Sequence, residues 1–174
     1  MSVLNVALIG SDEFARSLGK KGDSRDIDSY VHKESKDGGV RVLSLLRPLK
    51  HPESIRPLLS VLDVAKAGLL EIGALDAPVG EAMVALGCSG ISTGRAVIAP
   101  RDGEWIDPGQ VRVMLDQAGL SGWEIMEGDI DEHETREWLF GVQEELSKSA
   151  PDASSSSLIL PVDQHFNVKG VGLV

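Results

Sequence analysis

The residues from Gly10 to Ser17, GSDEFARS, have the length and position of a phosphate-binding loop. That loop reads G-x-x-x-x-G-K-[ST]: its glycines let backbone N–H groups approach phosphate oxygens, its lysine supplies a positive charge, and its hydroxyl group holds Mg²⁺. Gly10 and Ser17 match the pattern, whereas Ala15 replaces the second glycine and Arg16 replaces the lysine. A methyl group narrows the space for a phosphate, and a guanidinium differs in shape from an ammonium. Gly10, Arg16 and Ser17 are therefore candidates for a nucleotide site, with an ordinary strand-to-helix turn as the alternative.

The other residue types that could do chemistry form no constellation with a known role. No two histidines lie four residues apart, and Cys88 is the single cysteine, so we expect no metal site and no disulfide. We expect Cys88 to be a small buried residue at a helix end, and His51 and His133 to lie at the surface. No nucleophile and base stand at a suggestive spacing, so the sequence predicts no catalytic residue.

Apolar runs and helical spacing predict strands that alternate with helices over residues 1–148. Val3–Ile9 is an apolar run that ends at a glycine, which is typical of a buried strand. The stretch Asp23–Gly39 is polar and is predicted to be a loop that contains His32. The other predicted strands are 40–46, 67–72, 95–99 and 123–126, and the predicted helices are 14–20, 52–65, 79–86, 108–118 and 131–147.

This alternation predicts an α/β protein with a three-layer fold, in which helices cover both faces of a parallel sheet. Residues 149–157 contain Pro151 and four consecutive serines, which predicts a flexible linker. Residues 158–174 read LILPVDQHFNVKGVGLV and predict a second β-rich segment that is too short to form a stable domain alone. We expect the chain to be cut within a second domain, or this segment to pack as an appendage.

Charge is distributed unevenly along the 174 residues. The net charge of -10 divides into +2 for residues 1–50 and -12 for residues 51–174. The excess concentrates between Glu124 and Glu145, where nine acidic residues accompany Arg136 as the one basic residue. Such a run repels nucleic-acid phosphates. A solvated helix face is the simplest interpretation, and docking to a basic protein surface is the alternative.

Composition excludes several classes of protein. Aromatic residues make up 4 % of the chain, so we expect no base-stacking surface and no DNA partner. No apolar stretch of about 18 residues exists, and the first ten residues carry no basic leader, so we expect no membrane span and no signal peptide. The single cysteine fits the reducing cytoplasm, where we expect the protein to be located.

The last segment resembles the start of the second, β-barrel domain of translational GTPases, in the group of elongation factor Tu and the selenocysteine-specific elongation factor. Those proteins carry segments of the type LPVDxxFxxKGxG. The matching residues here are Leu160, Pro161, Val162, Asp163, Phe166, Lys169, Gly170 and Gly172. The resemblance implies that residues 1–148 are a G domain with a P-loop NTPase-like fold, that residues 149–157 are the joint, and that residues 158–174 begin the barrel.

The nucleotide motifs of that family are degenerate in this chain. Arg47–His51 lies where the family has D-x-P-G-H; Pro48 matches in register, and His51 matches after a shift of one residue. Asp102 lies where the guanine-reading N-K-x-D motif belongs, but the asparagine and lysine are missing. Neither of the two threonines lies where the family has the threonine of its first switch loop. Asp102 is thus a fourth candidate, as the remnant of a guanine site.

The resemblance and the missing motifs together predict a pseudo-GTPase: a G domain that serves as a scaffold, in a protein that acts in translation by binding tRNA, the ribosome or another factor. The tRNA or ribosome would be bound by the domain beyond Val174. No cofactor is expected. GTP with Mg²⁺ belongs to the first alternative, a divergent elongation factor with residual GTPase activity in which Arg16 replaces the lysine. A second alternative is a protein-interaction module that binds no nucleotide.

Overall fold

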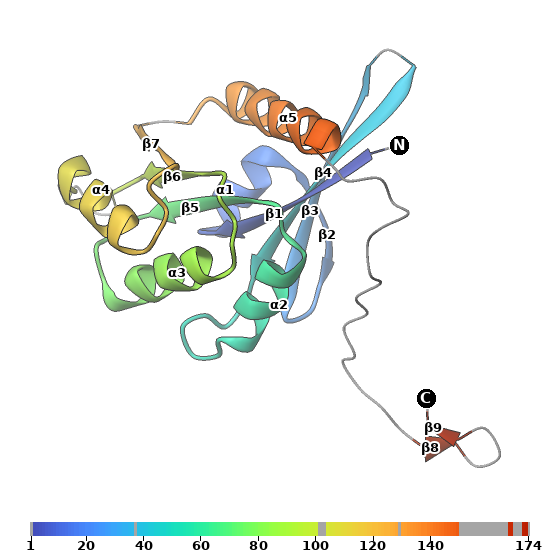
Figure 1. Ribbon diagram of the computed structural model, residues 1–174, viewed down its shortest axis with the longest axis horizontal. Helices are drawn as coiled ribbons and strands as arrows, with labels where there is room; N and C mark the ends of the chain where they lie inside the picture. The colour runs from blue at the N-terminus through green and yellow to red at the C-terminus, as the bar shows by residue number, and fades with distance from the viewer. Residues whose placement is uncertain are drawn as a thin grey trace.

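The computed structural model describes residues 2–36, 38–100, 104–128 and 130–149, and the backbone of residues 167–168 and 172–173. In this part of the chain, five helices surround a mixed seven-stranded sheet (Figure 1), so the predicted α/β class is confirmed. The strands of the sheet are β1 (Ser2–Ile9), β2 (Lys20–Ser24), β3 (Ile27–Lys36), β4 (Gly39–Pro48), β5 (Ala67–Ile72), β6 (Gly94–Ile98) and β7 (Glu124–Glu127). The helices are α1 (Asp12–Leu18), α2 (Arg56–Val64), α3 (Ala77–Cys88), α4 (Pro108–Gln117) and α5 (Glu132–Ser149).

The strand order is β2-β3-β4-β1-β5-β6-β7, with β1 near the centre of the sheet. Strands β4, β1, β5, β6 and β7 are parallel, as predicted. Strands β2 and β3 pair in the antiparallel sense and extend the sheet beyond β4. The prediction of an all-parallel sheet is therefore wrong for these two strands, which occupy most of the stretch predicted to be a loop.

The polarity of β3 explains why its sequence is typical of a loop. Successive side chains of a strand point to opposite faces of the sheet. In β3 the buried face carries Asp28 and Tyr30, which are polar residues. A half-buried strand is recognised in a sequence by apolar residues at every second position. Because the inward-facing side chains of β3 include a carboxylate and a phenol, this pattern is absent.

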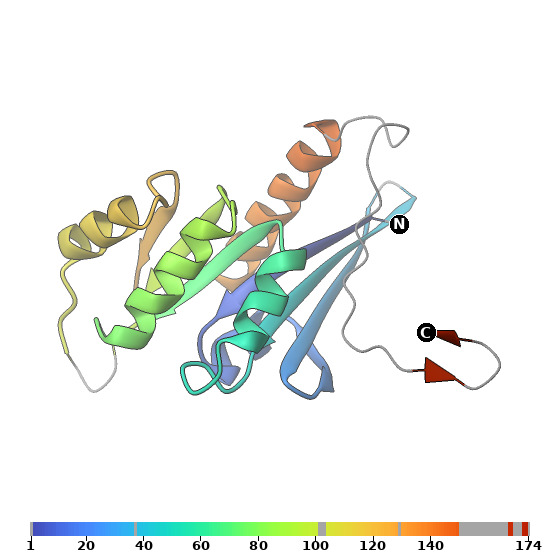
Figure 2. The same cartoon turned by 60° about the horizontal axis from the view of Figure 1, so that its bottom comes forward.

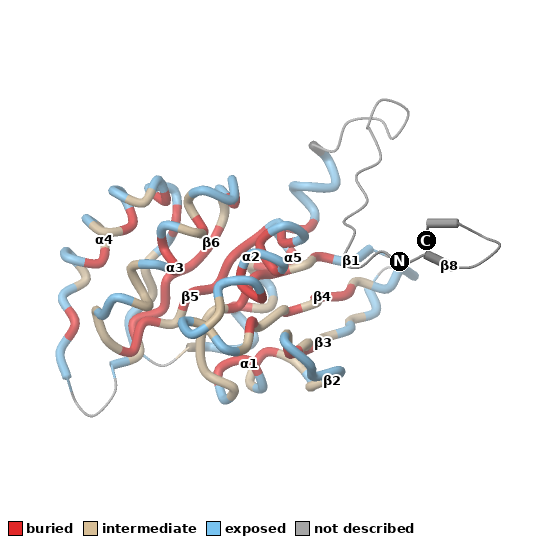
Figure 3. Tube along the Cα trace, turned by 90° about the horizontal axis from the view of Figure 1, so that it is seen from below, coloured by how far each residue is buried: buried red, intermediate tan, exposed pale blue. Residues whose placement is uncertain are grey.

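Helices cover both faces of the sheet, so the predicted three layers are confirmed. Helices α2, α3 and α4 pack on one face around an apolar cluster that includes Leu58, Met83 and Leu115. Helices α1 and α5 pack on the other face, where Leu18 and Phe140 are buried (Figure 2). Burial is concentrated along β5 and β6, while β2 at the outer edge is largely exposed (Figure 3).

Most helix boundaries differ from the predictions by one or two residues, and the start of α2 and the end of α3 are the informative cases. Helix α2 begins at Arg56, four residues later than predicted, with Pro57 in its first turn. Gly87 does not end α3, which continues to Cys88. Instead, a Cβ at Gly87 would lie 1.7 Å from the carbonyl oxygen of Ala118, so glycine allows the ends of α3 and α4 to approach. Cys88 itself is exposed, which corrects the prediction that it is buried.

The predicted linker and second domain fall largely outside the described residues. Residues 150–157 are not described. In residues 158–174, the backbone of β8 (Asn167–Val168) pairs in the antiparallel sense with that of β9 (Gly172–Leu173).

Candidate functional site

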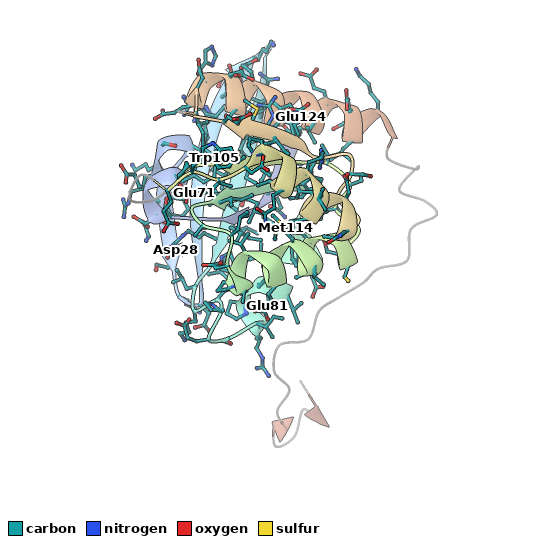
Figure 4. The ribbon with its side chains drawn as sticks, turned by 90° about the vertical axis from the view of Figure 1, so that its left-hand side faces the viewer. Asp28, Glu71, Glu81, Trp105, Met114 and Glu124 are labelled. Carbon is teal, nitrogen blue, oxygen red and sulfur yellow. The ribbon has the colours of Figure 1, made fainter. Side chains whose placement is uncertain are left out.

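The carboxyl ends of β1, β4 and β5 meet at one edge of the sheet, which Figure 4 views directly. From β1 the chain enters α1 on one face of the sheet, whereas from β5 it enters α3 on the opposite face. In open α/β sheets, the point where neighbouring strands send their helices to opposite faces leaves a crevice that commonly binds ligands. This crevice is the candidate functional site.

The turn from β1 into α1 is too short to enclose a phosphate. Gly10 and Ser11 alone separate the strand from the helix, which begins at Asp12. Ser11 caps the helix, because its Oγ accepts a hydrogen bond of 3.1 Å from the backbone N–H of Phe14. The residues that match the interior of a phosphate-binding loop are thus helical, and the N–H groups of Phe14 and Ala15 already bond to Ser11.

Glu71, at the carboxyl end of β5, faces this helix start. Its Oε2 accepts a hydrogen bond of 2.6 Å from the backbone N–H of Ser11, and its Oε1 accepts one of 3.1 Å from Ser11 Oγ. A Cβ on Gly10 would lie 2.8 Å from Glu71 Cβ, so the glycine is needed for this close approach. The first N–H groups of a helix attract anions, and here the anion is a carboxylate of the chain itself.

The candidate residues chosen from the sequence occupy different places. Gly10 lines the crevice. Arg16 lies on α1, is exposed, and forms an ion pair with Asp12. Ser17 Oγ donates a hydrogen bond of 2.8 Å to the carbonyl oxygen of Phe14, within the same helix. Asp102 lies outside the described residues. The structure therefore brings one of the four candidates to the crevice and places two others on the body of α1.

A group of paired charged and polar side chains from α1, β2, β3 and β4 lies beside the crevice. We call it the carboxyl-edge network; its members are Asp12, Lys21, Asp28, Tyr30 and Arg47. Asp28 is 2 % exposed and is its centre. The Asp28 carboxylate accepts hydrogen bonds from Lys21 Nζ at 2.7 Å, from Tyr30 Oη at 3.2 Å and from Arg47 Nη1 at 3.3 Å.

The network holds its two carboxylates in the charged form. Burial raises the pKa of Asp28, but the hydrogen bonds from Lys21, Ser24 and Tyr30 outweigh burial, and the pKa lies below its ordinary value. Hydrogen bonds from Tyr30, Arg16 and Lys21 lower the pKa of Asp12 strongly. The same contacts with Asp28 and Asp12 raise the pKa of Lys21.

Arg47 links this network to the crevice. Its Nε donates a hydrogen bond of 2.8 Å to the carbonyl oxygen of Gly10, while its Nη1 contacts Asp28. The end of β4 is thereby tied to the end of β1. Sequence reasoning missed Arg47 and Glu71 as site residues. The available signal was that Glu71 is the one charged residue of β5 and that Arg47 directly follows the apolar pair Leu45 and Leu46 in β4.

The crevice contains a pocket of about 330 Å³. Its charged and polar walls come from Arg47, Lys50, His51, Glu71 and Asp76, and Ile9 and Leu70 contribute to its apolar wall. The His51 side chain is 8 % exposed, so the prediction that it lies at the surface is wrong. Among the described residues, no group of three His, Cys, Asp or Glu side chains is placed to hold a metal ion.

The acidic run along α5 is partly paired with cations of the sheet. Arg95 Nε lies 2.7 Å from Glu124 and its Nη1 lies 3.3 Å from Glu134. Arg41 Nη1 lies 2.8 Å from Glu144. Several acids that were interpreted as a solvated face therefore help to hold α5 and β7 against the strands.

Comparison with known proteins adds one relative. No protein-family model matches the chain. An uncharacterized protein of Methanocaldococcus jannaschii is 27 % identical over 176 residues, which cover 100 % of this chain and 52 % of that protein. The chain thus spans about half the length of the relative that it matches. In the part of the chain that the structure describes, no helix is long and apolar enough to cross a membrane.

Proposed function

We propose that residues 1–148 form a G-domain-like scaffold that neither binds guanine nucleotides tightly nor hydrolyses GTP. A three-layer α/β fold with a crevice at the carboxyl ends of its strands is compatible with the P-loop type of fold that the sequence resemblance implies. On this proposal, the chain retains the sheet of a G domain and has lost the residues that bind and hydrolyse GTP.

The observation that carries the proposal is the pairing of Glu71 with Ser11. A bound phosphate at the start of α1 needs free backbone N–H groups and positive charge nearby. The N–H of Ser11 already donates to Glu71, and the carboxylate would repel a phosphate brought to the same place. A nucleotide would therefore have to displace the side chain that closes this part of the crevice.

The position of Arg16 supports the same conclusion. Phosphoryl transfer depends on a cation at the outer phosphates, on Mg²⁺ and on a group that orients the nucleophile. Arg16 is paired with Asp12 on the exposed side of α1, and Ser17 Oγ is bonded to Phe14. Two of the residues that would have to supply this chemistry are thus engaged within α1.

The test is a titration of the protein with fluorescent GTP and GDP, with and without Mg²⁺. We expect no saturable binding at concentrations up to about 100 µM, which corresponds to a binding free energy weaker than about -5.5 kcal/mol. Saturable, Mg²⁺-dependent and guanine-specific binding that is lost in Arg16→Ala would overturn the proposal and favour the divergent GTPase. Arg25→Ala, at an exposed arginine on the turn between β2 and β3, is the matched control.

We further propose that the scaffold acts in translation, through tRNA, the ribosome or another factor. This part rests on the likeness of residues 158–174 to the barrel domain of translational GTPases. The test is co-sedimentation of the full-length protein with purified ribosomes and a gel-shift assay with total tRNA. Binding to either supports the role, whereas binding to neither favours the protein-interaction module.

A further inference from the structure

We propose that the pocket in the crevice binds a small zwitterionic molecule of the amino-acid class, with one carboxylate and one ammonium group. The inference goes beyond the scaffold function, because it gives the crevice a ligand other than a nucleotide. It rests on a cation and an anion that both line the pocket, on the size of the space, and on a buried imidazole in the pocket wall whose Nε2 makes no hydrogen bond.

His51 is the buried imidazole of the pocket wall. Its side chain is more than nine-tenths buried, and its Nε2 has no hydrogen-bond partner. Glu81 Oε2 lies 3.6 Å from this nitrogen, which is beyond hydrogen-bond distance. Buried polar atoms are nearly always paired, so an unpaired one on a pocket wall is unusual. This nitrogen is itself closed to the pocket, so His51 contributes its ring to the wall and the partners for a charged ligand come from Arg47 and Glu71.

Arg47 and Glu71 give the pocket opposite charges with spare bonding capacity. A guanidinium carries five N–H donors, and the structure uses the Arg47 Nε for Gly10 and the Nη1 for Asp28. A carboxylate accepts about four hydrogen bonds, and Glu71 accepts two, both from Ser11. The remaining donors suit a ligand carboxylate, and the remaining lone pairs suit a ligand ammonium.

The start of α3 argues against a phosphate as the ligand. Asp76 caps this helix, since its Oδ1 accepts a hydrogen bond of 3.0 Å from the backbone N–H of Val79. Pro78, in the first turn, has no N–H to offer. With Glu71 at the start of α1 and Asp76 at the start of α3, both helices that face the crevice already meet a carboxylate. A dianion would add repulsion, whereas a molecule with no net charge would not.

The size of the pocket favours a small molecule with an apolar part. Its volume of about 330 Å³ lies at the low end of the range for small-molecule sites. Ile9, Leu70, Val79 and Ala82 line part of it and can receive an aliphatic side chain. An amino acid with an apolar side chain matches the charges and the walls together.

The test uses protein labelled with ¹⁵N in its histidines, whose ring nitrogens are observed by NMR. Each of the common L-amino acids is added in turn up to about 10 mM, which detects dissociation constants in the millimolar range. Acetate, butylamine and inorganic phosphate are added separately as probes with a single kind of charge. We expect a saturable shift of the His51 ring with at least one apolar amino acid and no comparable shift with the three simple ions.

Variants tie the shift to the proposed contacts. Glu71→Gln and Arg47→Gln should each weaken the binding about tenfold or more, because each removes one charge-assisted contact. His51→Phe places a larger ring without nitrogen atoms in the pocket wall, so it should weaken binding measured by calorimetry. His133→Phe, at an exposed histidine, is the matched control and should bind as the unaltered protein does. Circular dichroism spectra and thermal melts verify that each variant is folded.

Three results would overturn the inference. They are no His51 shift with any amino acid, an equal shift with acetate or phosphate, and unchanged binding in Glu71→Gln. A His51 shift with GTP and none with amino acids would overturn this inference and the scaffold function together. Amino-acid binding without GTP binding would support both.

Discussion

The carboxyl-edge network and the acidic run on α5 contain the same kinds of charged residues in opposite settings. In the network, the Asp28 carboxylate is buried and receives hydrogen bonds from two cations and two hydroxyl groups on β2, β3 and β4. On α5, the acids that pair with Arg95 and Arg41 are about half exposed; Glu144, for example, is 54 % exposed. Acidic and basic residues nearly balance in residues 1–50, and the excess of acids lies between residues 124 and 145. The charges that determine structure are nevertheless those of residues 1–50, which contain the whole carboxyl-edge network.

The difference follows from solvation. A buried ion that loses its partner is left without solvent to replace it, so breaking such a pair is strongly destabilising. An exposed ion regains water when its partner is removed, and exposed pairs contribute little. The two regions should therefore respond very differently to the same kind of substitution.

Asp28→Ala should produce the largest effect. It leaves Lys21 and Arg47 without their shared buried acceptor, and we expect the free energy of unfolding to fall by about 3–5 kcal/mol. Urea denaturation followed by circular dichroism measures the change. The matched control is Asp26→Ala, which removes an acid that is 68 % exposed and paired with Lys50, and should cost about 0.5 kcal/mol or less. Equal losses in the two variants would contradict the contrast between the regions.

The pH dependence of stability should also originate in the carboxyl-edge network. The folded-state pKa of Asp28 is below its unfolded-state value, so its contribution is complete at neutral pH and is lost as the pH falls from about 4 toward the folded-state pKa. Comparing urea midpoints of the unaltered protein and Asp28→Asn from neutral to acidic pH tests this. The gap between the two proteins should narrow below about pH 4. A difference in urea midpoint that stays constant with pH would show that Asp28 stabilises the fold through packing and not through its charge.

The contrast also shows what the sequence could predict. The apolar run of β5 was predicted with both of its ends, and Gly119, with φ of 82°, ends the region of α4 as expected, because these signals lie within a few neighbouring residues. The hairpin of β2 and β3 was missed because its inward residues, Asp28 and Tyr30, are polar. They are satisfied by partners on other elements, and no local pattern reports such partners. The pairing of Glu71 with Ser11, 60 residues apart, was invisible for the same reason.

Glu71→Ala should have an intermediate effect, since Glu71 is half-buried. It removes the acceptor of the Ser11 N–H at the start of α1, and we expect a loss of about 1–2 kcal/mol. Asp76→Ala removes the local cap of α3 and should cost about 1 kcal/mol. Urea denaturation of both variants compares the long-range cap with the local one. If Glu71→Ala left the free energy of unfolding unchanged, the hydrogen bond from the Ser11 N–H to Glu71 would not stabilise the start of α1.

Glu144→Gln should have the smallest effect, although it breaks an ion pair between α5 and β4. Arg41 keeps its ion pair with Glu34 and stays stacked on the Phe140 ring, 4.2 Å from its centre. Its charge therefore remains partnered, and we expect a change of about 0.5 kcal/mol or less, smaller still in high salt. Urea denaturation in low and high salt measures this change in the free energy of unfolding. A loss comparable to that of Asp28→Ala would mean that the α5 pairs act as buried ones, and that the two regions differ in sequence position and not in physics.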